Sequence, residues 1–231
     1  MEEKIMAITA SMVKELREMT GAGMMDCKKA LTETNGDMDA AVDVLKKSGA
    51  AKMEKKQSRI AAEGIARVAV NGNVAVVAEV NSETDFVAKN ETFQEFVQTV
   101  ADTALASDLN GGANGEDIEA LLATNGLSDL LVEKTATIGE KLSVRRFAKV
   151  TGDVVTSYIH GGGRIGVIIA ANGATDDAAK EAITNIAMQV AAMSPKYTSR
   201  DEVDASFLEH EKEILLAQAK NDPKNANKPD N

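Results

Sequence analysis

The chain has 231 residues, a net charge of −10 from 26 basic and 36 acidic side chains, and only 3% aromatic residues. This length suggests one large domain or roughly two to three small modules, and the negative charge disfavours general binding to nucleic acids or anionic membranes. The single cysteine, Cys27, excludes an intrachain disulfide. Neither a secretory leader nor an apolar run of membrane-spanning length is recognisable. We therefore expect a cytoplasmic protein without direct nucleic-acid or membrane binding.

Residues 1–54 are predicted to form a three-helix head. Apolar side chains recur at helical spacing in three stretches within residues 12–45, and glycine-containing breaks separate them. Asp37 is expected to cap the third helix and Gly49 to end it. Residues 48–62 carry several basic side chains with little apolar periodicity, so we expect an exposed linker there, either helical or irregular.

After the head, the pattern changes to alternating, β-branched residues. The runs 65–70 and 74–80 flank Asn71-Gly72-Asn73, which is typical of a β-hairpin. Further elements are expected as helices near residues 93–104, 118–122, 127–138 and 178–192, and as strands at 142–150, 154–159 and 165–171. The pattern of a hairpin followed by a helix recurs about 90 residues later, which predicts two similar subdomains.

The predicted fold class is α+β, with antiparallel sheets and helices in two subdomains behind the helical head. The expected domains are the head at 1–54, a core N-subdomain at 55–140, a core C-subdomain at 141–198 and a helical arm with a frayed terminus at 199–231. In the arm, Phe207 and Ile214, like Leu208 and Leu215, are spaced by one heptad. Such a narrow apolar seam requires a partner helix.

The segment Gly161–Gly166 contains the letters of a dinucleotide-binding fingerprint. That fingerprint requires a helix after the glycines, whereas a β-branched run follows here, so a hairpin turn is the expected alternative. His160, beside the glycines, is interpreted either as hairpin surface or as a partner contact. Because His and Cys residues are not clustered at the spacing of metal ligands, we expect no metal and no cofactor. A small enzyme that uses this loop on a nucleotide remains the alternative function.

Phe86 is the one aromatic residue in the polar segment 81–90. It is interpreted either as a cap over the core or as an anchor for another protein, because exposed aromatic side chains are frequent hot spots of interfaces. The basic residues between Lys28 and Arg59 are likewise either a solvated face or a docking patch for an acidic protein.

Two long segments resemble the signatures of bacterial elongation factor Ts. They are residues 16–31, LREMTGAGMMDCKKAL, and residues 79–88, EVNSETDFVA. Residues 138–140 and 157–167 are also similar to that family. The resemblance implies a ubiquitin-associated-like head, a core of two antiparallel-sheet subdomains and a helical hairpin. Because similar chains continue with a second hairpin helix and a strand, we expect the hairpin here to be partial and the C-subdomain incomplete.

The resemblance also implies a function, guanine nucleotide exchange on the GTPase elongation factor Tu, by binding rather than by enzymatic catalysis. Phe86 would act as a wedge between helices of the GTPase, and Asp85 would disturb the magnesium side of the nucleotide site. Further partner contacts are implied for Thr84, Val87, Lys28, Met24, Met25, Ile138, Gly139 and His160. A homodimer through the arm stays open, as does an adaptor that binds helices without exchange activity.

Overall fold

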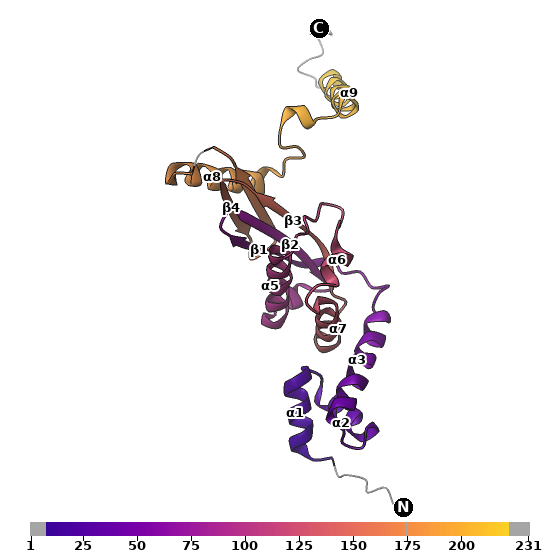
Figure 1. Cartoon of the computed structure of the whole chain (residues 1–231). Helices are drawn as coiled ribbons and strands as arrows, with labels where there is room; N and C mark the ends of the chain where they lie inside the picture. The colour runs from indigo at the N-terminus through magenta and orange to yellow at the C-terminus, as the bar shows by residue number, and fades with distance from the viewer. Residues whose placement is uncertain (1–7, 174, 222–231) are drawn as a thin grey trace, which may run out of the picture. The chain divides into compact units, whose positions relative to one another are not determined.

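The computed structural model describes residues 8–173 and 175–221. Helices and antiparallel strands occupy successive blocks of this part of the chain, which confirms the α+β class (Figure 1). The chain divides into two compact units, Met1–Ala192 and Met193–Asn231, and each is described by itself. The helices are α1 (Ala10–Thr20), α2 (Met24–Glu33), α3 (Met38–Glu54), α4 (Asp85–Ala88), α5 (Glu91–Ala106), α6 (Ile118–Leu122), α7 (Leu127–Ile138), α8 (Asp177–Met193), the 3-10 helix η1 (Arg200–Glu202) and α9 (Ala205–Asn221). The strands are β1 (Glu63–Asn71), β2 (Val74–Ser82), β3 (Ser143–Thr151), β4 (Val154–His160) and β5 (Ile165–Ala171).

The head consists of α1, α2 and α3, as the apolar periodicity predicts. Its small core contains the fully buried side chains of Leu16, Cys27 and Leu31. Burial raises the pKa of the Cys27 thiol, which therefore behaves as an apolar core residue. The predicted cap is confirmed, because the Asp37 carboxylate accepts a hydrogen bond of 3.0 Å from the N–H of Ala40.

Gly49 does not end the third helix, and this prediction was wrong. Helix α3 continues to Glu54, and Gly49 is buried where α3 packs against α7. A Cβ atom at this position would lie 3.2 Å from Cγ1 of Val132 and 3.6 Å from Cβ of Ala136. The glycine therefore permits close approach of two helices, and its lack of a side chain is used for packing rather than for a helix stop.

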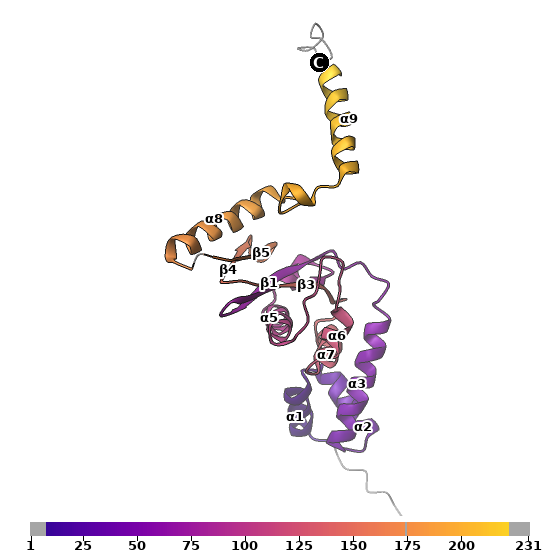
Figure 2. The same cartoon turned by 45° about the horizontal axis from the view of Figure 1, so that its top comes forward.

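The first sheet has the strand order β1-β2-β3, and both pairs are antiparallel. The expected hairpin between β1 and β2 is present, with Gly72 at a φ of 58° in its turn. Helix α5 covers one face of this sheet and buries Phe93, Phe96 and Val100 against it. Figure 2 shows α5 on one side of the sheet and the second sheet on the other.

The second sheet contains β4 and β5, with α8 packed on it through Val167, Ala187 and Ala191. The two sheets approach closely, since a Cβ atom on Gly166 would lie 2.9 Å from Cγ2 of Val77. A backbone hydrogen bond of 2.7 Å from the N–H of Ala66 to the carbonyl of Gly163 joins β1 to the β4–β5 turn. The hairpin turn is thereby fixed beside the start of the first sheet.

Strand β3 pairs with β2, in a register that sets Val77 opposite Ala148. The domain boundary expected between residues 140 and 141 therefore separates β3 from the sheet to which it is hydrogen-bonded. An alternating pattern indicates that a strand exists, but it does not identify the strand's partner.

In the second unit, α9 buries none of its side chains. Its apolar residues Leu208, Ile214 and Leu215 are exposed, while Phe207 contacts the ring of Tyr197 edge to face at 5.6 Å. The frayed terminus expected at residues 222–231 lies outside the described residues. Within the described part of the chain, no helix is both long and apolar enough to cross a membrane.

Candidate functional site

Phe86 projects into solvent from α4, a single helical turn between β2 and α5. Its side chain is 80% exposed, whereas the neighbouring Ala88 is buried in the main core and Val87 packs against that core. The Thr84 hydroxyl caps the turn by accepting a hydrogen bond of 3.4 Å from the N–H of Val87. The interpretation of Phe86 as a core cap was therefore wrong, and the ring is free to contact another molecule.

Asp85 lies beside Phe86 and is paired with Lys89 on the next helical turn. The ammonium is 2.7 Å from the carboxylate, and both side chains reach solvent, Lys89 more than Asp85. This hydrogen bond and charge hold the pKa of Asp85 below its ordinary value, with a smaller contribution from the charge of Arg164. Arg164 belongs to the β4–β5 turn. Residues 83–88 are defined here as the Phe86 loop.

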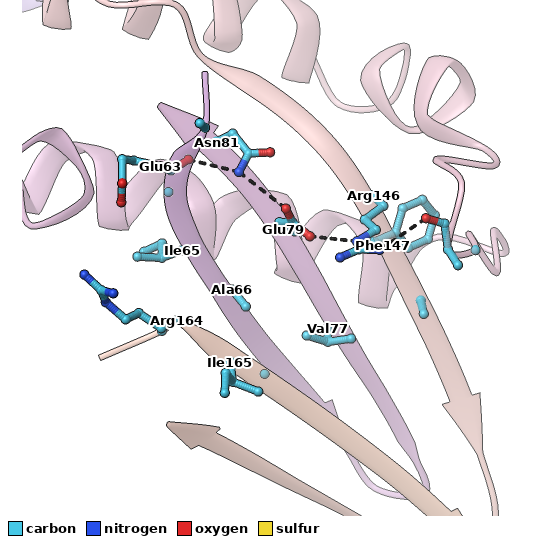
Figure 3. A pocket seen from close by; sticks show the side chains of 17 residues that line it. Glu63, Ile65, Ala66, Val77, Glu79, Asn81, Arg146, Phe147, Arg164 and Ile165 are labelled. Carbon is cyan, nitrogen blue, oxygen red and sulfur yellow. Dashed lines mark hydrogen bonds and ion pairs between the residues drawn. The ribbon is translucent and has the colours of Figure 1, made fainter. Parts of the chain in front are cut away.

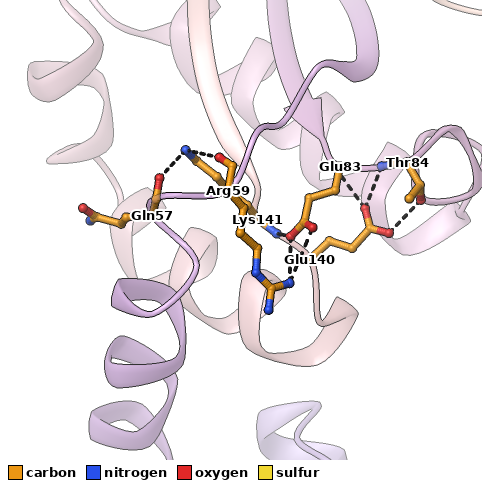
Figure 4. Close-up of polar contacts among 6 residues, drawn as sticks. All are labelled: Gln57, Arg59, Glu83, Thr84, Glu140 and Lys141. Carbon is orange, nitrogen blue, oxygen red and sulfur yellow. Dashed lines mark hydrogen bonds and ion pairs between the residues drawn. The ribbon is translucent and has the colours of Figure 1, made fainter.

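The Glu140 side chain forms hydrogen bonds with the start of the Phe86 loop (Figure 4). Glu140 is the second residue after α7. One carboxylate oxygen accepts hydrogen bonds from the backbone N–H groups of Glu83 and Thr84, at 3.1 and 3.0 Å. The other oxygen accepts a bond of 2.6 Å from the Thr84 hydroxyl. A single side chain therefore fixes both the backbone and the capping residue at the start of α4.

Glu83 of the Phe86 loop in turn contacts the connection between α7 and β3. Its carboxylate accepts a hydrogen bond of 2.6 Å from the N–H of Lys141 and lies 3.2 Å from the Arg59 guanidinium. The Lys141 hydrogen bond and, after it, the Arg59 guanidinium lower the pKa of Glu83. The Lys141 ammonium in turn donates to the carbonyls of Gln57 and Arg59, at 2.6 and 2.9 Å. Three segments, the linker after the head, the Phe86 loop and the α7–β3 connection, meet in this network.

Ile138 and Gly139 lie directly before Glu140, so the network brings them close to Thr84. Gly139 ends α7 at a φ of 87°, and its N–H donates to the Thr135 carbonyl at 3.1 Å. Glu140 itself was missed as a site residue at the sequence level. A carboxylate next to a helix-ending glycine is a weak local signal, and nothing in the pattern indicates its contact with residues 83 and 84.

His160 is the exposed last residue of β4, directly before the turn that contains Arg164. Its Nδ1 atom is 3.0 Å from the Tyr158 hydroxyl. The turn is anchored to β1 by the bond between Ala66 and Gly163. His160 is thereby held near the start of the first sheet.

Met24, Met25 and Lys28 form a separate surface on the head. Met24 and Met25 are 60% and 75% exposed at the start of α2, and Met19 at the end of α1 is also exposed. We call Met19, Met24 and Met25 the methionine surface. Among the described residues, no hydrogen bond or ion pair joins it to the Phe86 loop, and the connection between the two regions runs through α3 and α7.

A groove of about 610 Å³ lies between the first sheet and the β4–β5 turn (Figure 3). Its polar groups are largely paired with one another: Glu79 accepts from Arg146 at 2.7 Å and from Asn81 at 3.3 Å. The glycine segment is a turn between two strands and not the start of a helix. In residues 8–173 and 175–221, no three His, Cys, Asp or Glu side chains are placed to hold a metal ion. Because β5 and not a helix follows the glycines, this turn does not supply the helix N-terminus by which a dinucleotide-binding fingerprint binds phosphate.

An exposed aromatic ring on a hydrogen-bonded helical turn is suited to contact with another protein, and the comparison with known families agrees. A family model described as Elongation factor TS matches residues 83–231, which is more than half of the chain and begins at the first residue of the Phe86 loop. Proteins of this family are nucleotide exchange factors for elongation factor Tu. The chain therefore belongs to the elongation factor Ts family.

Proposed function

We propose that the chain releases nucleotide from elongation factor Tu by inserting Phe86 between helices of the GTPase domain. The observation that carries this proposal is a phenyl ring that is 80% exposed on a helical turn clamped by Glu140. A GTPase holds its nucleotide through P-loop amides, a lysine and a Mg²⁺ ion that bridges phosphate oxygens. A wedge that displaces the elements supporting the metal weakens these contacts together, without a covalent step.

Burial of the Phe86 ring in the partner supplies the free energy for this displacement. Transfer of a phenylalanine side chain from water to an apolar site contributes roughly 1.5–3 kcal/mol. Because the loop is already hydrogen-bonded, little of this free energy is used to order it on binding. The remainder is available to distort the partner.

Asp85 is proposed to make the adjacent polar contact on the magnesium side of the nucleotide site. For this contact it must exchange its present partner, Lys89, for a group on the GTPase. That ion pair is exposed on both sides, and exposed ion pairs contribute little to stability. The exchange of partners is therefore energetically easy.

The remaining contacts are proposed at two places. Around the wedge, the contributing residues are Thr84, Val87, Ile138, Gly139 and His160. On the head, Met24 and Met25 supply exposed, adaptable apolar side chains and Lys28 supplies a charge. The head contacts would hold the factor on the GTPase, while the contacts around Phe86 would act on the nucleotide site.

Reciprocity constrains this mechanism. If the factor lowers the affinity of the GTPase for nucleotide, nucleotide lowers the affinity for the factor by the same ratio. The factor must therefore bind the nucleotide-free GTPase more tightly than the GDP-bound form, since equal affinities would produce no exchange.

The direct test is the release of labelled GDP from elongation factor Tu with catalytic amounts of the chain. We expect acceleration by the native chain and a strong loss with Phe86→Ala or Asp85→Ala. Ile186→Ala, which removes an exposed apolar side chain from α8, is the matched control. Full acceleration by the Phe86→Ala, Asp85→Ala double variant would contradict the wedge. Nucleotide binding by the chain alone would favour the enzyme alternative, and tight binding without release would favour the adaptor.

The same proposal places the chain in the cytoplasm, bound to elongation factor Tu and to no nucleic acid or membrane. It also includes a homodimer through α9, whose exposed Leu208, Ile214 and Leu215 are supporting features. Sedimentation of the native chain tests this dimer, and replacement of Leu208 and Leu215 by Ser is expected to shift it to the monomer.

A further inference from the structure

We propose that Glu140 is a positioning residue for nucleotide exchange: it holds the Phe86 loop in its binding orientation and ties it to the linker behind the head. This inference rests on the proposed role of Phe86 as the group that enters the partner. Glu140 acts through the loop, and no contact of its own with the partner or the nucleotide is required.

Several hydrogen bonds from the start of the Phe86 loop converge on one carboxylate. Glu140 accepts three bonds of 2.6 to 3.1 Å, all from Glu83 and Thr84, the two residues that precede α4. Bonds to an ionised acceptor are about twice as strong as bonds between neutral groups. Helix α4 has only four residues and cannot be stable by itself, so its orientation depends on this external support.

The hydrogen-bond network around Glu140 continues to the linker behind the head. Glu83, in the Phe86 loop, accepts from the backbone of Lys141 and pairs with Arg59. Lys141, next to Glu140, binds the carbonyls of residues 57 and 59 with its ammonium group. Helix α3 of the head ends at Glu54, three residues before Gln57. The linker is therefore joined to the Phe86 loop by one ion pair and by hydrogen bonds, in addition to the covalent chain.

Helix α7 contacts the head and ends beside the Phe86 loop. Its middle packs against Gly49 of the head, and Glu140 follows Gly139, the residue that caps its C-terminal end. Thr137, near the same end of α7, donates to the Gly21 carbonyl in the head at 3.4 Å. One helix, α7, therefore contacts the head and leads directly into the residue that holds the Phe86 loop.

Replacement of Glu140 is expected to loosen the loop without unfolding the protein. The Glu140 side chain is only half-buried, so water can take its place on the two backbone N–H groups. The ring of Phe86 then samples several orientations, and only a fraction of them fits the partner. Misplacement of a positioned group by about 1 Å can lower a rate by roughly 100-fold.

The kinetic test compares Glu140→Ala and Glu140→Gln with the native chain in the GDP-release assay. At saturating factor, we expect Glu140→Ala to lower the maximal release rate roughly 10- to 100-fold. Glu140→Gln keeps a carbonyl oxygen for the two backbone N–H groups and is expected to recover part of the rate. Glu119→Ala, on α6, removes an exposed carboxylate and is the matched control. Native maximal rates in both Glu140 variants would overturn the proposal.

A second readout uses the absence of tryptophan from the sequence. Phe86→Trp introduces a single indole at the tip of the loop, and its time-resolved fluorescence anisotropy reports the loop's motion in the isolated full chain. Adding Glu140→Ala is expected to enlarge the fast decay component, whereas adding Glu119→Ala leaves it unchanged. Unchanged anisotropy on adding Glu140→Ala would overturn the proposal, even if exchange were impaired.

The two proposals fail in different ways. If Phe86→Ala exchanges nucleotide at the native rate, the wedge is wrong, and with it the role of Glu140 in exchange, although the anisotropy result still shows whether Glu140 orders the loop. If Phe86→Ala abolishes exchange while both Glu140 variants remain native in rate and anisotropy, only the positioning role is overturned.

Discussion

The Phe86 loop and the methionine surface both expose apolar side chains, but they are built in opposite ways. Phe86 stands on one helical turn whose backbone is fixed by Glu140 and, through Glu83, by Lys141. Met24 and Met25 stand on a regular helix, and their long side chains have no polar clamp within the described residues. One surface is ordered before binding and the other can adapt on binding.

The two regions are therefore suited to different roles in binding. A preorganised aromatic group loses little conformational entropy on binding, so more of its binding free energy is available to displace part of a partner. Flexible thioether side chains repack against many surfaces and suit attachment better than distortion. We therefore expect changes in the loop to alter the rate of exchange, and changes in the methionine surface to alter affinity.

The largest effect is expected from the ring itself. Phe86→Ala removes roughly 3 kcal/mol of apolar contact in the displaced state, which corresponds to a loss of about 100-fold in the maximal rate of GDP release. Phe86→Leu, which keeps an apolar side chain of smaller size, is expected to lie between Ala and the native chain. A change confined to the half-saturating concentration would assign Phe86 to attachment and remove the contrast between the regions.

The next largest effect is expected at Gly49, where α3 of the head packs against α7. Gly49→Val places two methyl groups where Cγ1 of Val132 already lies 3.2 Å from a Cβ atom, so we expect a loss of about 1–3 kcal/mol in the free energy of unfolding. Ala51→Val, at an exposed position of the same helix, should cost only about 0.5 kcal/mol. Urea unfolding followed by circular dichroism measures both, and equal losses would show that Gly49 is not a packing position.

A smaller effect is expected on the methionine surface. Met24→Ala combined with Met25→Ala should raise the half-saturating concentration of the factor about tenfold and leave the maximal rate unchanged. Met188→Ala, which removes an exposed methionine from α8, is the control. A lower maximal rate in the head variant would mean that attachment and displacement are not separate.

Features predicted from the sequence and features missed by it differ in the range of the interactions behind them. The Asp37 cap and the hairpin at Gly72 depend on neighbours a few residues away, and both were predicted. The burial of Gly49 depends on Val132, and the clamp on Thr84 depends on Glu140, 56 residues later. Such contacts are fixed by tertiary packing, for which a single sequence contains no periodic signal. Exposure of Phe86 was one of two alternatives for the same reason.

The smallest effect is expected in the pH dependence of the free energy of unfolding, and it reports on the contacts of the Glu83 carboxylate. The groups that face its carboxylate are the N–H of Lys141 and the charges of Arg59 and Lys56, and together they lower its pKa from an ordinary value of 4.5. A lowered folded-state pKa contributes stability that is fully present above about pH 4.5 and is lost as the pH falls through the folded-state value. The free energy of unfolding of Glu83→Gln should therefore lie below that of the native chain at neutral pH and approach it under acid conditions. Because the carboxylate stays ionised between about pH 6 and 8, we expect the loop anisotropy of the Phe86→Trp chain to be constant there. A difference between native chain and Glu83→Gln that does not narrow in acid would show that Glu83 stabilises the loop by packing and not by its charge.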